Sequence, residues 1–209
     1  MRGEERLSVF INCPFDRAYR RLLHAIVFTV HDCGYVARSA LEITDASQVR
    51  VSKILNIISE CRIGIHDISR TELSPKTRLP RFNMPLELGM FLGAKEFGSK
   101  KQRQKICLVL DRSPDRYRKF CSDIAGQDIS THGRNVERAI AAVRNFLRDA
   151  APPDVLIPGG PKIYQRYLRF SKNLPAFCRA LGQSKDELTF RDFTGFVAQW
   201  LKRHAVPRA

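Results

Sequence analysis

The chain has 209 residues, of which 44% are hydrophobic and 27% are charged, so it can bury one substantial core, and wholesale disorder is not expected. Its formal net charge of +15 favours partners that carry phosphate, although a solvated basic surface would give the same count. Because no apolar stretch approaches the roughly 20 residues that span a bilayer and no apolar leader follows Met1, we expect a cytoplasmic protein with no membrane partner.

The first three quarters of the chain alternate between strand and helix patterns. Buried strands are indicated by short continuous apolar runs, and helices by apolar residues that recur three and four positions apart. Pro14 ends the first strand because proline cannot donate to a ladder, Gly34 ends the first helix, and Ser47 is expected to cap the second. The pattern predicts strands at residues 7–12, 35–38, 62–68 and 105–111, and helices ending near 31 and 58 and spanning about 83–97 and 132–149.

This alternation is typical of a parallel sheet covered by helices on both faces. We therefore predict an α/β fold, a flavodoxin-like three-layer sandwich, over residues 1–150. Prolines and glycines mark a connector at 151–161, and residues 162–209 read as a C-terminal helical extension. The last helix carries an apolar stripe from Phe193 to Leu201, which we expect to pack on the main domain or on a second copy.

Cysteine and histidine positions argue against a metal centre. None of the six cysteines forms a C-x-x-C pair, and most lie inside apolar segments, which is typical of reduced, buried thiols. The five histidines are scattered along the chain as well. We therefore expect no metal and no resident cofactor.

Polar residues gather where the predicted strands end. In an open parallel sheet, ligands bind beyond the carboxyl ends of the strands, so residues from distant parts of the chain are expected to meet there. The third helix brings a carboxylate, Glu87, to the same crevice, near the helix start. The candidate residues at the strand ends are Asn12, Phe15, Asp16, Arg17, Asp67, Ser69 and Asp111.

Glu87 is the candidate catalytic group. We expect Asn83 to cap its helix, and we expect the free N–H groups of the first turn to hold the carboxylate ionised. An ionised carboxylate beside the anomeric carbon of a sugar can attack it or stabilise an oxocarbenium-like transition state.

Local structure offers an alternative explanation for each of these residues. Asparagine and glutamate near a helix start are ordinary capping and dipole residues. A strand-end aspartate such as Asp67 can bond its own loop. Arg17 can grip phosphate bidentately or simply lie on a solvated helix face.

Three segments resemble the nucleoside 2-deoxyribosyltransferase-like and TIR-like superfamily: Phe10–Asp16, His66–Ser69 and Asn83–Gly89. The most specific part is an aspartate at a strand end followed by N-x-x-x-E-L-G on the next helix, and the resemblance spans about residues 8–112. Members share a flavodoxin-like fold. Many of them cleave or exchange N-glycosidic bonds of nucleosides, nucleotides or NAD, and several bacterial members serve in antiphage defence.

The resemblance implies a role for each matching residue. Glu87 would be the nucleophile, and Asp67 would help to bind the sugar or base of the substrate. Asn83 would orient Glu87 or touch the sugar. The first loop, matched by Asn12, Phe15 and Asp16, would line the base or phosphate side. A nucleotide or NAD would then be substrate rather than cofactor, and the protein partner would be a second copy of the chain or another defence protein.

Three functions therefore remain open. The first is an N-glycosidase or ribosyltransferase acting on NAD or a related nucleotide through Glu87. The second is a catalytically silent module that senses a nucleotide and signals through a protein partner. The third is nucleic-acid binding through the basic stretch 95–118, which is densest in the basic run Lys100–Lys105. It ranks last because that run has no interleaved aromatic residues and the chain contains no recognised reading motif.

Overall fold

A computed structural model describes residues 8–73 and 78–205. Its centre is a five-stranded sheet in the order β2-β1-β3-β4-β5, with every neighbouring pair parallel. This is the flavodoxin-like strand order, so the predicted fold class is confirmed. Leu7, expected to begin the first strand, lies outside the described residues. The strands are β1 (Ser8–Asn12), β2 (Val36–Arg38), β3 (Ile63–Asp67), β4 (Ile106–Asp111) and β5 (Ile129–Thr131).

The strand register brings the polar strand ends to one edge of the sheet. Asn12 pairs with His66 across β1 and β3, and Asp67 pairs with Leu110 across β3 and β4. Every residue of β1 and β3 is buried, as a strand covered on both faces requires. The last residues of β1, β3 and β4 therefore lie side by side at the carboxyl edge.

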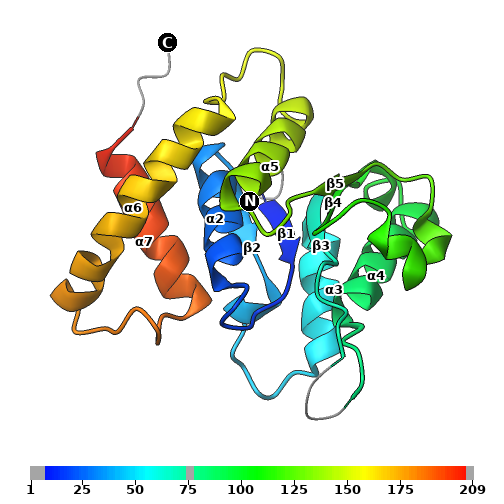
Figure 1. Cartoon of the computed structure of the whole chain (residues 1–209). Helices are drawn as coiled ribbons and strands as arrows, with labels where there is room; N and C mark the ends of the chain where they lie inside the picture. The colour runs from blue at the N-terminus through cyan, green and yellow to red at the C-terminus, as the bar shows by residue number, and fades with distance from the viewer. Residues whose placement is uncertain (1–7, 74–77, 206–209) are drawn as a thin grey trace.

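Helices cover both faces of the sheet (Figure 1). On one face, α2 (Arg20–Asp32) and α5 (Val136–Ala150) pack in the larger apolar cluster. On the other, α3 (Arg50–Glu60) and α4 (Asn83–Phe97) close two smaller clusters. Short 3₁₀ turns fill the connections: η1 (Ala40–Glu42), η2 (Gln102–Gln104), η3 (Arg116–Lys119) and η4 (Ser122–Ile124).

The C-terminal helices α6 (Gly160–Ala180) and α7 (Phe190–Arg203) pack beside α2 and α5 (Figure 1). The ring of Phe28 on α2 lies 5.3 Å from that of Phe170 and 5.8 Å from that of Trp200. A buried ion pair adds a polar anchor, with Arg166 Nε 2.9 Å from Asp32 Oδ2. The extension therefore shares one core with the sheet, as the apolar stripe on the last helix predicts.

Two helix starts and one strand differ from the sequence-based expectation. Strand β5 is not predicted, because its three residues are half-buried and form no apolar run. The helix expected from His132 begins at Val136, because Gly133 and Arg134 have left-handed φ angles of 56° and 59°. Ser47 does not cap α3, because its Oγ donates to Asp45 Oδ1 at 2.7 Å and the helix starts at Arg50.

In the part of the chain that the structure describes, no helix combines the length and the apolar composition needed to cross a bilayer. All six cysteines are free thiols, and four of them are buried.

Candidate functional site

Asn12, the last residue of β1, fastens the start of α4 to the sheet. Its Nδ2 donates to Met84 O at 2.8 Å and lies 3.1 Å from His66 Nδ1. Burial, followed by the charge of Lys105, lowers the pKa of His66 to about 3, so this ring is neutral and its Nδ1 can accept. Asn12 Oδ1 is buried and has no hydrogen-bond partner among the described residues. It is therefore a buried acceptor that the described residues leave unsatisfied.

Glu87 lies on α4 and is only 5% exposed. Burial raises the pKa of its carboxyl group to about 7, with the charge of Arg50 acting weakly in the opposite direction. No hydrogen bond or ion pair joins this carboxylate to residues 8–73 or 78–205. Glu87 is thus a buried acid that the surrounding protein leaves without a partner.

Glu87 does not receive the stabilisation of its charged form that we expect from the helix start, and the reason is its position. Glu87 is the fifth residue of α4, beyond the first turn whose free N–H groups stabilise a negative charge. Desolvation is therefore the larger effect, and it favours the neutral acid.

Asn83 does not cap α4. Phe82 occupies the cap position without a side-chain hydrogen bond, and Asn83 is the first helical residue, with an exposed side chain. It makes no hydrogen bond to Glu87 in the structure. Its expected role in orienting that carboxylate has no support in this geometry.

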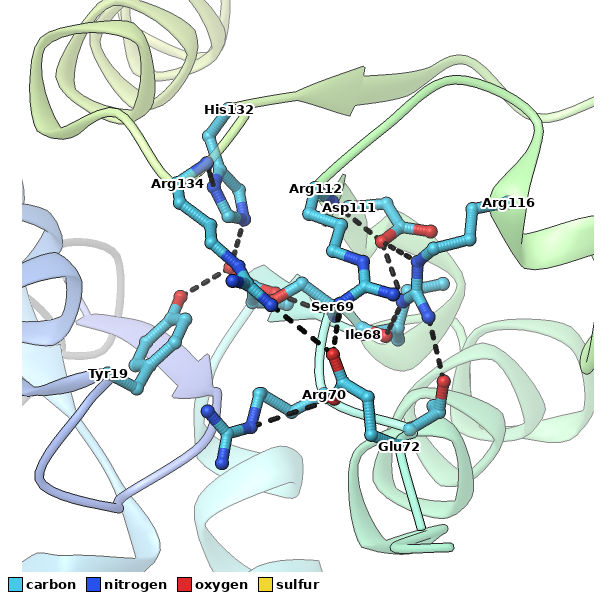
Figure 2. A network of polar contacts seen from close by, with 12 residues as sticks. Tyr19, Ile68, Ser69, Arg70, Glu72, Asp111, Arg112, Arg116, His132 and Arg134 are labelled. Atoms are coloured by element: carbon cyan, nitrogen blue, oxygen red, sulfur yellow. Dashed lines mark hydrogen bonds and ion pairs between the residues drawn. The ribbon is translucent and has the colours of Figure 1, made fainter.

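Asp67, the last residue of β3, is fully buried, and two hydrogen-bond donors and a histidine ring surround it. Its Oδ1 accepts from Ser69 N at 2.8 Å, and its Oδ2 accepts from Tyr19 Oη and lies 3.0 Å from His132 Nε2 (Figure 2). The Ser69 contact is the local loop bond that a strand-end aspartate commonly makes. The other two come from segments 48 and 65 positions away in the sequence, so Asp67 holds three loops together.

His132 is a site residue that sequence patterns do not reveal. Its Nδ1 accepts from Arg134 N at 2.9 Å, so in the neutral ring the proton is on Nε2, which faces Asp67. Sequence patterns do not single out His132 because it follows β5, whose three residues form no recognisable strand pattern. Tyr19 is not singled out either, because its spacing from Leu22 and Ile26 makes it look like one more apolar core residue of α2.

Cys13 connects the two carboxylates. Burial raises the pKa of its thiol well above the usual value, and the charges of Asp67, Glu87 and Asp16 add to that effect in this order. Both Asp67 and Glu87 therefore lie close to this sulfur. The strand-end aspartate and the helix carboxylate therefore both act on Cys13, which follows β1.

In the loop after β1, the polar contacts of Asp16 stabilise the loop itself. Asp16 Oδ1 accepts from Ala18 N at 3.1 Å and Tyr19 N at 3.2 Å. Phe15 packs against the main core and lines a cavity of about 140 Å³ beside α7. Arg17 is exposed. None of these contacts marks the three side chains as ligand-binding groups.

Asp111 is the last residue of β4, and it binds Arg116 at the carboxyl edge of the sheet. It is fully buried, and its Oδ1 accepts from Arg116 Nε at 2.9 Å. Burial raises the pKa of Asp111, and the bond from Arg116 acts against that rise. Arg116 also donates to Thr71 Oγ1 at 2.9 Å and to Ile68 O at 2.8 Å. It thereby ties the loop after β3 to the end of β4 (Figure 2).

A cavity of about 420 Å³ opens at this carboxyl edge. It lies between the loops after β1, β3 and β5 and the start of α5. Among its lining residues are Tyr19, Arg21, Ser69, Arg70, His132, Arg134, Asn135 and Tyr164. Three of them, Tyr19, Ser69 and His132, also contact Asp67.

A larger cavity, of about 780 Å³, lies at the opposite edge of the sheet. Residues 59–63, Lys105 and residues 150–152 form part of its wall. The side chain of Lys105 donates to Ile58 O and Cys61 O at the end of α3. We assign this cavity no chemical role, because the unusual polar residues of the chain lie at the other edge. Among the described residues, no group of three or more His, Cys, Asp and Glu side chains is placed to hold a metal ion.

Comparisons of the chain with known protein families, with curated proteins and with solved structures return no match. Function is therefore inferred from the residues at the carboxyl edge and from their geometry.

Proposed function

We propose that this protein cleaves the N-glycosidic bond of NAD or a related nucleotide, or transfers its ribosyl group, with Glu87 as the acting carboxylate. The observation that carries the proposal is the environment of Glu87. It is buried, it has no partner among the described residues, and its pKa is raised to about 7. A buried acid without a partner lowers stability, and such groups are concentrated at functional sites.

The location of Glu87 also supports a catalytic role. Ligands of parallel α/β sheets bind at the carboxyl edge, and Glu87 lies on α4, whose start is bonded to Asn12 at the end of β1. A pKa near 7 leaves both protonation states populated at neutral pH. The ionised form can attack the anomeric carbon or stabilise an oxocarbenium-like transition state, and the protonated form can assist a departing base.

Two neighbours would assist without doing the chemistry. Asn12 is a positioning residue, because its Nδ2 holds Met84 O at the start of the helix that carries Glu87. Asp67 is a positioning residue, because its two oxygens are already engaged by Tyr19, Ser69 and His132. It would fix the loops that surround the substrate.

The test is release of free base from NAD and from a panel of nucleotides and nucleosides, separated by liquid chromatography. We expect E87Q to lower turnover by at least about a hundredfold, because the amide keeps the shape but loses the charge. The matched control is E96Q, an exposed site at the other end of the same helix, which should retain wild-type turnover. If the ionised form acts, the wild-type rate should rise as the pH increases through about 7.

Unchanged turnover in E87Q would contradict the catalytic assignment. Tight nucleotide binding without release of base from any compound would favour the silent sensing module instead.

A further inference from the structure

Three arginines converge on the carboxylate of Glu72, in the loop after β3 (Figure 2). Arg112 pairs with Oε1, and Arg134 Nη2 lies 3.4 Å from the same oxygen. Arg70 Nε lies 3.7 Å from Oε2. The three guanidinium groups come from the loops after β3, β4 and β5, so only the fold brings them together.

The single negative charge of Glu72 does not neutralise the three positive charges of these guanidinium groups. The side chain of Glu72 is 39% exposed, and exposed ion pairs contribute little to stability. Arg70 has a second acidic neighbour, with its Nη2 3.3 Å from Asp16 Oδ2, but Arg112 and Arg134 share Glu72 alone among the described carboxylates. A phosphate group offers more negative charge and more acceptor oxygens than Glu72, and guanidinium groups bind it bidentately.

Two of the three arginines border the cavity at the carboxyl edge. Arg70 and Arg134 line this space of about 420 Å³ together with Tyr19, Ser69 and His132, the residues that surround Asp67. The arginine cluster comes from the loops after β3, β4 and β5, whereas Glu87 lies on α4, whose start is bonded to Asn12 at the end of β1. This arrangement suits a substrate with its phosphate at one end and its reacting sugar at the other.

We propose that Arg70, Arg112 and Arg134 bind the phosphate of the substrate, and that Glu72 occupies this anion site until the phosphate displaces it. The inference rests on the proposed function in assigning the phosphate to a nucleotide substrate. The anion site itself is tested without catalysis.

The experiment is calorimetric titration of inorganic pyrophosphate into the full-length protein at two salt concentrations. Wild type should bind, more weakly at the higher salt concentration. R112A should weaken binding by about tenfold or more, because a charge-assisted bond is lost. E72Q should tighten binding about three- to tenfold, because the ligand no longer competes with a carboxylate.

Arg134→Gly removes the side chain at a position where the backbone conformation suits glycine. Arg134 has a left-handed φ of 59°, which glycine adopts without strain. R134G should therefore melt no lower than wild type and still lose pyrophosphate affinity about tenfold.

Matched controls lie at the opposite edge of the sheet. R103A and E96Q repeat the charge changes at exposed positions and should leave affinity unchanged. R17A tests the exposed arginine of the first loop. The proposal is overturned if pyrophosphate does not bind, if R103A or R17A loses as much affinity as R134G, or if E72Q fails to gain affinity.

E87Q separates the two proposals. It should bind pyrophosphate as wild type does, because Glu87 lies outside the arginine cluster. If the anion site behaves as expected and no base is released by wild type, then only the proposed function fails.

Discussion

Among the individual side chains, the two buried carboxylates of the crevice have opposite surroundings. Asp67 accepts hydrogen bonds from Tyr19 and Ser69, and His132 Nε2 lies 3.0 Å from its Oδ2. Glu87 has none among the described residues, and burial raises its pKa to about 7. A satisfied carboxylate stabilises the loops that it joins, whereas an unsatisfied one is costly whenever it is charged.

This difference predicts how stability depends on pH. The folded-state pKa of Glu87, about 7, exceeds the ordinary value of 4.5. Between those values the folded protein keeps a proton that the unfolded chain has lost, so the free energy of unfolding falls as the pH rises. E87Q cannot ionise and should be more stable than wild type at pH 8 by about 3 kcal/mol.

Urea unfolding at pH 5 and pH 8 measures the effect. The gain from E87Q should be clearly larger at pH 8, and E96Q should show no such dependence. An equal gain at both pH values would mean that desolvation does not govern this carboxyl group.

Among the helices and strands, α3 has an unusual end, because Lys105 caps it rather than contributing to a basic surface. Its ammonium group donates to Ile58 O and Cys61 O and lies 4.6 Å from the centre of the Phe91 ring. Burial lowers the pKa of Lys105 to about 8. The last residue of the basic run Lys100–Lys105 is therefore a structural cap, which leaves less charge for a nucleic-acid surface.

Replacing Lys105 with methionine should destabilise the protein. K105M keeps the chain length but leaves the two carbonyl groups without a donor, at a cost of about 2 kcal/mol. K100M removes the same charge from an exposed position and should change stability by less than about 0.5 kcal/mol. Chemical denaturation of both variants checks the difference, and equal effects would refute the capping role.

In the molecule as a whole, the C-terminal helices complete the core. Phe170, Phe193 and Trp200 are buried in the same cluster as α2 and the sheet. Each large aromatic side chain lost from a core costs about 3–5 kcal/mol. Three such losses approach the roughly 5–15 kcal/mol that stabilises a typical domain.

Truncation after Pro158 should therefore prevent normal folding. We expect the product to aggregate or to lose its cooperative thermal transition, because the outer side of α2 would be exposed to water. Light scattering after size-exclusion chromatography and calorimetry measure the two outcomes. A monodisperse truncated protein with the wild-type melting temperature would show that α6 and α7 are dispensable.

Local sequence patterns are sufficient to predict the architecture of the sheet and the edge where its polar residues meet. Continuous apolar strands alternating with amphipathic helices permit few arrangements other than a parallel sheet covered on both faces. The carboxyl ends of such strands share one edge, so the amino-acid order alone places Asn12, Asp67 and Asp111 together. These patterns repeat over enough residues to be recognised directly.

Which side chains become partners depends instead on the folded chain. Strand β5 has three half-buried residues, and its pairing with β4 rather than its own pattern makes it a strand. His132 and Arg134 follow β5, so no local pattern predicts their contacts with Asp67 and Glu72. The raised pKa of Glu87 escapes sequence-based prediction for a related reason. The position of a residue along a helix can be predicted from sequence. The burial of its carboxyl group without a hydrogen-bond partner depends on every element packed around it.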